Sequence, residues 1–513
     1  MDKKTGKTTD RDKKGGRVLF TAAVLLLLVI AASWTLYARG KAKEASAEPQ
    51  QEQELPKEPI PEEKLPEETS EEEKNKEEAE KAAAAEAKRA AGEKASYMTD
   101  YESAPLLNTT PIRYLSMEVG ATEDELRFNW MSPDRNPGQV SFADAQTGEA
   151  KSFAADCAAS VTTPGYYVNK ASVTGLQQGK TYVYKVGNDT GGWSPEYQYT
   201  VPDVNTKEGF TFLVTSDAQI GQDQNHEEQV TVDDWDKMVT RLTSYVPEAQ
   251  FLIHAGDQVS QFGSAQEYEG FLNHLGLYKI PLVPVVGNHD VANEDSVEEL
   301  GYSGGPFFYE HFNVPNRSEE YGLSQSDKDG NYYFIRGDVL FLVLNSATAQ
   351  PTDIHEEYVP KVIAEHPDIK WRVIIQHYPA YSSVQHYQEK MDPWIRNSLA
   401  YICEDNDIDL VISGHDAAYA RSGFTDRKCQ VYEGYDYSSG GTAVNPEGTL
   451  YITCSTASGS IYNEVSPSGW LKFEGQPHAP VALRFDVTDT QFHMRAYTTD
   501  SWTLYDEYTI QKD

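Results

Sequence analysis

The sequence predicts an α/β domain that is preceded by a small β-sandwich and, at the N-terminus, by a transmembrane helix. After Pro202, apolar runs rich in β-branched residues alternate with helical stretches, which is the pattern of an α/β domain. Between 105 and 202, short alternating runs recur about every ten residues, as in a β-sandwich. Residues 18–38 are 21 consecutive positions without a charge.

The composition limits the classes of function that are open to the chain. Its 513 residues carry 80 Asp and Glu against 44 Lys and Arg, a formal net charge of −36. So large an acidic excess repels phosphate backbones, and no nucleic-acid binding is expected. The length suits two or three domains of roughly 150 residues each, and collagen-like, disulfide-framework and wholly disordered classes are excluded.

The N-terminal segment predicts a single-pass protein of the cell membrane. At about 1.5 Å per residue, the apolar helix 18–38 crosses a hydrocarbon core of ~30 Å. Seven basic residues in the tail 1–17 place that tail in the cytoplasm and the body of the chain outside it. A cleaved signal peptide is the alternative, but 18–38 is long for one and the small-residue site 45–47 lies far downstream.

Residues 39–104 are predicted to be an acidic, low-complexity linker. Within them, 44–95 hold seventeen Glu against eight Lys or Arg and almost no aromatic residues. Such a composition cannot bury enough apolar surface to offset the entropy lost on ordering. A spacer that holds the body away from the membrane is therefore favoured over a specific binding segment.

The predicted β-sandwich, 105–203, carries no arrangement of ligands or nucleophiles. Its alternating runs include 126–130, 138–142 and 182–186. The segment 175–187 resembles the turn and strand of a fibronectin type III module. This part is therefore expected to be a structural or positioning domain.

In the predicted α/β domain, 204–513, each of five apolar runs is followed by Asp, Asn or His. The carboxyl ends of such strands meet at one edge of a sheet, where open α/β folds build their sites. The polar residues that follow the runs are Asp217, Asp257, the Asn288–Asp290 group, His377 and His415. Carboxylate, amide and imidazole groups together suit Mn, Fe or Zn better than an all-oxygen calcium site. The edge is therefore a predicted metal site.

The order of these motifs, D-x-Q, G-D-x-x-S, G-N-H-D, H and G-H-D, resembles that of the calcineurin-like metallophosphoesterases. With the sandwich in front, the chain is similar to their purple acid phosphatase-like branch over about residues 105–510. The resemblance implies a four-layer α/β/β/α sandwich. It also implies hydrolysis of phosphate mono- or diesters by a metal-activated water. Together with the predicted N-terminal anchor, this gives a membrane-anchored hydrolase outside the cytoplasm.

The resemblance assigns roles to the residues at this edge. It implies up to two divalent ions, Fe, Mn or Zn, with these ligands: Asp217 on the first, Asp257 bridging both, and Asn288, His377 and His415 on the second. His289 would lie beside the metals and donate a proton to the leaving oxygen.

Three positions depart from the pattern of the family. Gln219 stands where many relatives have a ligating His, and Ser260 stands where branches of the family have Asp or Tyr. Ala417 replaces the second His of G-H-x-H, which binds the first metal. The first site should therefore be weaker, or shifted toward Mg, Ca or Mn. The same departure leaves open a degenerate relative that has lost turnover and serves as a surface binding or scaffold protein.

Other residues near the motifs have two interpretations that the sequence leaves open. His254 is structural or lies next to the ligands, and Arg421 faces a phosphate or pairs with carboxylates. Tyr378, Tyr381 and His386 line a substrate pocket or pack in the core.

The cysteines and the remaining motifs suggest no further chemistry. Cys157, Cys403, Cys429 and Cys454 form no C-x-x-C pair and are predicted to be small buried hydrophobic residues. The glycine-rich segment 301–306 follows no apolar run and opens no helix, which predicts a surface loop. No P-loop, G-x-S-x-G or H-E-x-x-H motif occurs, so nucleotide-driven, serine-esterase and zincin mechanisms lack support.

Overall fold

The fold belongs to the compact unit Glu78–Asp513 of the chain. The computed structural model describes these residues: 109–203, 209–222, 228–291, 305–318, 320–321, 331–347, 352–390 and 392–513. The predicted cytoplasmic tail 1–17, transmembrane helix 18–38 and linker 39–104 lie outside them. Within the described part, every helix is too short or too polar to cross a bilayer.

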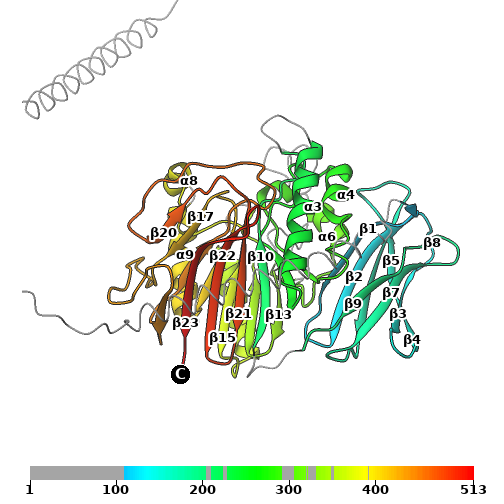
Figure 1. Cartoon of the computed structure of the whole chain (residues 1–513), viewed down its shortest axis with the longest axis horizontal. Helices are drawn as coiled ribbons and strands as arrows, with labels where there is room; N and C mark the ends of the chain where they lie inside the picture. Colours follow the sequence, from blue (N-terminus) through cyan, green and yellow to red (C-terminus); the bar gives the residue numbers. More distant parts are fainter. Residues whose placement is uncertain are drawn as a thin grey trace, which may run out of the picture. The chain divides into compact units, whose positions relative to one another are not determined.

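The first nine strands form the two sheets of a β-sandwich (Figure 1). One sheet contains β1 (Arg113–Val119), β2 (Glu125–Ser132), β6 (Tyr167–Thr174) and β5 (Asp156–Ala159). The other contains β4 (Ala150–Ala154), β3 (Gln139–Asp144), β7 (Thr181–Asn188) and β8 (Gly192–Trp193), with β9 (Tyr197–Thr200) paired to β7. Buried rings of Phe128, Phe142 and Tyr184 pack against one another between the sheets. The predicted sandwich is confirmed.

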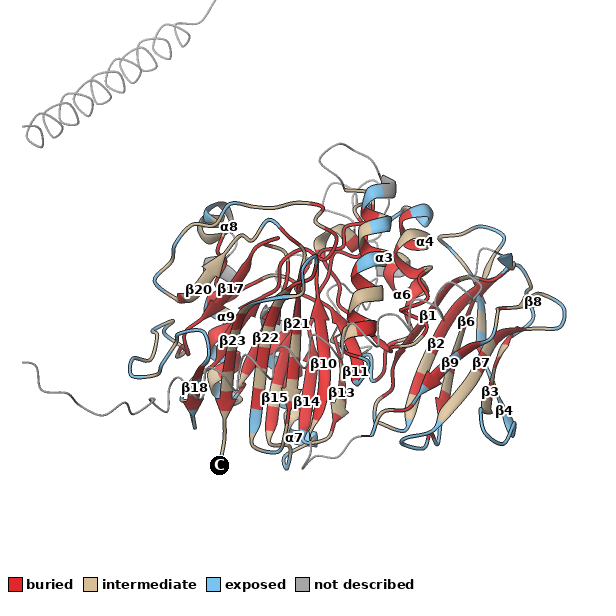
Figure 2. Ribbon diagram, in the orientation of Figure 1, coloured by how far each residue is buried: buried red, intermediate tan, exposed pale blue. Residues whose placement is uncertain are grey.

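Two sheets form the α/β part, and the first of them continues into the β1 sheet of the sandwich. The first runs in the order β18 (Gly441–Val444), β23 (Thr503–Gln511), β22 (Gln491–Thr498), β21 (Val481–Val487), β10 (Phe210–Thr215), β11 (Ala249–His254) and β12 (Leu282–Pro284). The second runs β13 (Tyr332–Arg336), β14 (Val339–Val343), β15 (Trp371–Ile375), β16 (Leu410–Ser413), β19 (Leu450–Thr453), β17 (Tyr419–Ser422) and β20 (Leu471–Gly475). In Figure 2 the central strands are buried along their length.

These two sheets face each other and carry helices on their outer faces. Phe212 of β10 meets Phe341 of β14 edge to face, with ring centroids 5.4 Å apart. Leu340 and Leu342, which alternate with Phe341, point the other way into a core shared with the outer helices. The helices are α3 (Glu228–Tyr245), α4 (Ala265–Leu272), α6 (Gly305–His311), α7 (Thr352–Glu365), α8 (Gln385–Lys390) and α9 (Asp392–Asp405), with a short 3-10 turn, η2 (Asn288–Asp290). The predicted mixed α/β fold is confirmed.

The predicted surface loop 301–306 lies outside the described residues at 301–304, and the prediction is wrong at 305–306. Gly305 and Pro306 begin α6. A proline fits the first turn of a helix because its missing N–H is not needed there. The glycine–proline pair, which usually marks a turn, therefore marks a helix start here.

The sandwich holds α6 firmly. Lys170 donates from Nζ to the carbonyls of Tyr309 and, at 2.7 Å, of Phe312, and so binds backbone acceptors that the end of a helix leaves unpaired. The Glu310 carboxylate accepts hydrogen bonds of 2.7 Å each from Ser160 Oγ and Val161 N on the sandwich.

A strand pairing also joins the two parts. The strand β1 pairs with β12 in parallel, at Glu118 and Leu282, so one sheet of eleven strands runs through both parts.

One carboxylate is buried at this junction without a donor. Glu118 is fully buried, and neither of its carboxylate oxygens lies in hydrogen-bond geometry with a donor among the described residues. Burial raises the pKa of Glu118 from its ordinary 4.5 to about 8, although the Ser116 hydroxyl and the Lys170 ammonium act in the opposite direction. The carboxyl group is therefore mostly protonated in the folded chain at neutral pH.

Glu118→Gln is expected to flatten the pH dependence of stability. Because the pKa of Glu118 is higher in the folded than in the unfolded chain, its protonated form stabilises the wild type fully below about pH 4.5. This stabilisation falls by about 1.4 kcal/mol per pH unit up to about pH 8. Thermal unfolding between about pH 5 and 8 should show a smaller fall in Tm for the variant. Glu196→Gln, at an exposed carboxylate of the sandwich, is the control. Equal falls in Tm for the wild type and Glu118→Gln would contradict this assignment.

Candidate metal centre

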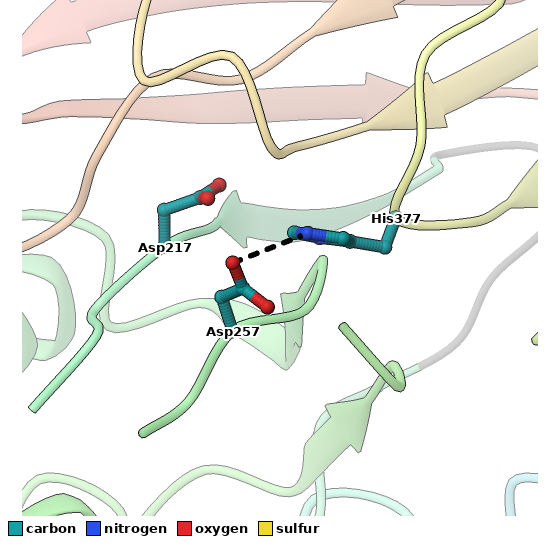
Figure 3. Close-up of side chains that lie close together, drawn as sticks. All are labelled: Asp217, Asp257 and His377. Carbon is teal, nitrogen blue, oxygen red and sulfur yellow. Dashed lines mark ion pairs between the residues drawn. The ribbon is translucent and has the colours of Figure 1, made fainter. Parts of the chain in front are cut away.

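Three of the predicted ligands come together where strands of the two facing sheets end (Figure 3). Asp217 follows β10, Asp257 follows β11, and His377 follows β15. One donor atom of each lies within 4.8 Å of the others, and all three side chains are buried. His377 Nε2 lies 3.3 Å from Asp257 Oδ2. The rule that strands of an α/β sheet deliver polar groups to their carboxyl edge therefore holds for residues far apart in the sequence.

The backbone around these residues is held in unusual conformations. Asp217, Asp257 and His415 have φ values of 53°, 56° and 72°, in the left-handed region where residues other than glycine are uncommon. Such strain, of order 1–3 kcal/mol per residue, persists only where the surrounding structure enforces it, and it collects at functional sites. Gly256 has φ 103°, and a Cβ there would strike the imidazole of His377. The tight turn before Asp257 therefore requires glycine.

The hydrogen bonds of His377 fix the orientation of its ring. Nδ1 donates to the carbonyl of Ala255 at 2.9 Å, which leaves Nε2 facing Asn288 Oδ1 at 3.1 Å and Asp257. A carbonyl that holds the outer nitrogen of a histidine is the usual support of a metal ligand. Burial acts to lower the pKa of His377, but the Asp257 and Asp217 carboxylates outweigh it and raise the pKa to about 9. The pocket therefore attracts positive charge.

Two buried polar atoms in this cluster have no hydrogen-bond partner among the described residues: Asp217 Oδ1 and His415 Nδ1, which lies 3.7 Å from Asp416 Oδ1. The other oxygen of Asp217 accepts from the backbone N–H of His415 at 2.9 Å, which ties the two residues together. The rings of Tyr378 and Tyr387 flank His415, with centroids at 4.7 and 4.3 Å. Buried polar atoms are rarely left unpaired. A carboxylate oxygen and an imidazole nitrogen in this state, next to Asp257, Asn288 and His377, fit a divalent cation.

His289 lies beside this cluster and is oriented by two hydrogen bonds. Its backbone N–H donates to Asp257 Oδ1 and its Nδ1 lies against the carbonyl of Ser260, each at 2.9 Å. With the ring proton on Nδ1, Nε2 is the nitrogen that remains to exchange a proton.

Two further carboxylates hold the ligand loops, and sequence reasoning gave them no role. Asp290 accepts from the backbone N–H groups of Asp257, Gln258 and Gly287 at 2.7–2.9 Å. Asp416 accepts from Ser382 Oγ at 2.7 Å and from the N–H of Ser383 at 2.9 Å. Both are acids directly next to predicted site histidines, which is the one signal in the sequence that points to them.

The positions that depart from the family pattern are filled as follows. Gln219 donates from Nε2 to Asp257 Oδ2 at 3.3 Å and accepts from Ser460 Oγ at 3.1 Å. Ala417 is buried with φ 49° and offers only its carbonyl, which accepts from Gln476 Nε2. The side chain at 417 therefore supplies no donor to a metal.

The structure also decides between the interpretations left open for other residues. His254 is buried and packs against the rings of Trp235 and Phe271, with centroids at 5.2 and 5.0 Å, and burial lowers its pKa to about 3, so it is a neutral structural residue. Arg421 is fully buried and donates to both oxygens of Asp506, so it pairs with a carboxylate.

Two of the predicted pocket residues and the cysteines are placed as follows. Tyr381 is buried and packs on Tyr451, with ring centroids 4.7 Å apart, whereas Tyr378 flanks His415.

Cys403 and Cys454 are buried as predicted, but the prediction is wrong for Cys157 and Cys429, which are only half-buried. Cys157 lies on β5, the last strand of its sheet, where one side stays open to solvent.

Known proteins match both parts of the chain. Residues 210–419 match the family Calcineurin-like phosphoesterase, and residues 113–201 match the family Purple acid Phosphatase, N-terminal domain. The chain is similar to the structure of a purple acid phosphatase isolated from yellow lupin (Lupinus luteus) seeds, with a TM-score of 0.61 and 17% sequence identity. That similarity covers 79% of this chain and 75% of the lupin chain, and at this identity it shows the fold alone.

Proposed function

This chain joins a calcineurin-like phosphoesterase domain to a purple acid phosphatase N-terminal domain, and on that premise we propose that it is a metal-dependent hydrolase of phosphate mono- or diesters. The observation that carries the proposal is the buried group of Asp217, Asp257 and His377, in which Asp217 Oδ1 and the neighbouring His415 Nδ1 have no hydrogen-bond partner among the described residues. When bound, divalent ions supply Lewis acidity for a phosphoryl group and lower the pKa of a water.

In this proposal the two metal positions have unequal ligand sets. Asp217 would hold the first ion, Asp257 would bridge, and the second ion would have Asn288, His377 and His415 as well. Because Ala417 supplies no donor, the first position depends on oxygen ligands and suits Mg, Ca or Mn better than the Fe, Mn or Zn expected at the second. The residues of the chain orient both carboxylates and both imidazoles before any ion binds.

The proposed role of His289 is to donate a proton to the leaving oxygen. His289→Ala is expected to keep bound metal but to slow the hydrolysis of an alkyl phosphate by about 10²–10⁴-fold, the usual size of general acid catalysis. An aryl phosphate with a good leaving group should be affected much less, because its leaving oxygen needs little protonation. Rates toward the two esters, with metal content measured alongside, test this. Equal losses toward both esters would remove His289 from this role.

A second candidate function is a binding or scaffold protein without turnover, and Ala417 is the observation that favours it. A chromogenic phosphate ester, assayed with Mn, Fe, Zn and Mg in turn, separates the two. Hydrolysis with any of these metals supports the enzyme. Tight binding of the ester or of inorganic phosphate without turnover supports the scaffold.

We also propose that the body stands outside the cell on a single membrane anchor. The support is the uncharged segment 18–38 behind the basic tail 1–17, followed by the acidic linker 39–104. Protease added to intact cells is expected to release the body by cutting within the linker. Protection until the membrane is opened would contradict the orientation. A mature N-terminus after residue 47 would instead identify a cleaved signal peptide.

A further inference from the structure

A buried glutamate lies behind His289, on the far side of one peptide bond. The carbonyl of Ser260 lies 2.9 Å from His289 Nδ1, and the N–H of the same peptide unit, that of Gln261, donates to Glu267 Oε2 at 2.7 Å. Since the C=O and N–H of a trans peptide point in opposite directions, the imidazole and the carboxylate hold its two ends. The N–H of Ser260 also donates to Glu267 Oε2, at 2.8 Å.

Glu267 does not make the helix-capping bond that its sequence position predicts. Ser264 is the N-cap of α4, and its hydroxyl accepts from the N–H of Glu267. In a capping box, the Glu267 carboxylate would in turn accept from the N–H of Ser264. That N–H instead donates to the carbonyl of Gln261, at 2.9 Å, so the carboxylate is left to reach the preceding turn. The helix start is therefore complete without the acid.

The chain also keeps space clear for this carboxylate. Glu267 is only 5% exposed. Gly221 packs against it, and a Cβ at Gly221 would lie 2.7 Å from Glu267 Cδ and 2.8 Å from Oε1. Any other residue at 221 would force the Glu267 carboxylate or the backbone at 221 to shift.

A charged acceptor behind this peptide strengthens the bond in front of it. Hydrogen bonds to a carboxylate are roughly twice as strong as neutral ones, and bonds in a chain polarise one another. The Ser260 carbonyl thereby becomes a better acceptor for the Nδ1 proton of His289. Holding that proton on Nδ1 keeps Nε2 as the nitrogen that exchanges protons and fixes the plane of the ring.

We infer that Glu267 is a positioning residue that acts on His289 through the Ser260–Gln261 peptide. The inference rests on the proposed function, because it concerns the group that would protonate the leaving oxygen. It adds a carboxylate that does not touch substrate or metal. The backbone of Ser260, and not its side chain, carries the connection.

The first test compares leaving groups in the full chain. Glu267→Ala is expected to slow hydrolysis of an alkyl phosphate by about 10–100-fold, the loss typical of second-layer partners. The loss toward an activated aryl phosphate should be much smaller, and metal content should not change. Glu267→Gln keeps an acceptor oxygen without the charge, so it should lie between the alanine variant and the wild type. Gln266→Ala, at an exposed neighbour on α4, is the control.

A double-mutant cycle with His289→Ala separates positioning from a general structural role. In the His289→Ala background, Glu267→Ala and Glu267→Gln are both expected to have no further effect on the alkyl ester. Effects that multiply instead, or equal losses toward both esters, would overturn the inference and leave the proposed function standing. A wild type that hydrolyses neither ester would defeat the proposed function.

An NMR measurement, which needs no turnover, tests the inference even if the wild type hydrolyses neither ester. In the full chain labelled with ¹⁵N-histidine, the Nδ1 proton of His289 is expected to give a resonance protected from exchange, assigned by its absence in His289→Ala. Glu267→Ala should remove that protection, and Glu267→Gln should reduce it. An unchanged resonance in both variants would overturn the inference.

Discussion

Replacing His377 by alanine is expected to remove bound metal and abolish hydrolysis of phosphate esters. His377 Nε2 faces Asp257 and Asn288, and its Nδ1 is fixed by the carbonyl of Ala255. No flexible side chain from the surface can place a nitrogen at the position of His377 Nε2, because the His377 side chain is completely buried. The loss of activity should exceed about 100-fold, since even residues that only support a ligand cost 10–100-fold.

Metal analysis and kinetics on the purified chain measure both effects. His493→Ala is the matched control, because His493 lies on β22, is partly exposed and pairs with Glu507 at 3.4 Å. The control should keep metal and rate. A His377→Ala variant that is folded and still binds metal like the wild type would contradict the assignment of the centre.

The second large effect is expected from Gly256→Ala. A Cβ at residue 256 would lie 2.7 Å from His377 Cγ and closer still to Nδ1, so the imidazole must move and lose its bond to Ala255. The backbone strain of a side chain at φ 103° adds about 1–3 kcal/mol. The variant should therefore lose metal as well as several degrees of Tm.

Gly434→Ala separates strain from collision. Gly434 has the same φ of 103°, but a Cβ there would meet no atom within 4 Å. This control should lose stability and keep its metal. Equal metal content in the two variants would mean that the packing of Gly256 on His377 does not shape the centre.

The predicted site residues were accessible from sequence because each directly follows a strand. Asp217, Asp257 and His377 stand two or three residues beyond the ends of buried strands, and parallel strands bring such positions together. What the sequence could not supply was the direction of side chains. Asp290 and Asp416 resemble further ligands in the motifs, yet their oxygens bind groups on the ligand loops, mainly backbone N–H groups.

Long-range pairings escaped prediction for a different reason. The contact between Glu118 and Leu282 joins strands far apart in the sequence, and neither strand carries a mark of the other. Glu267 is similar, because its place after Ser264 predicts a helix cap and only the structure places its carboxylate on another turn. A local sequence pattern indicates the role of a residue within its own helix or strand. It does not indicate the contacts that the residue makes with a distant element.

The parallel pairing of β1 with β12 has a consequence for how the chain resists aggregation. Without the sandwich, β12 would be the outermost strand of its sheet, and its residues Leu282, Val283 and Pro284 are all apolar and buried in the intact fold. An open, apolar edge recruits strands from other molecules. The sandwich moves that edge away to β5, a four-residue strand that is mostly exposed and carries Asp156. The sandwich, in whose described residues no group of candidate metal ligands is found, thus covers an edge that would favour self-association. A fragment cut between the two parts is expected to lose solubility even if it keeps its fold.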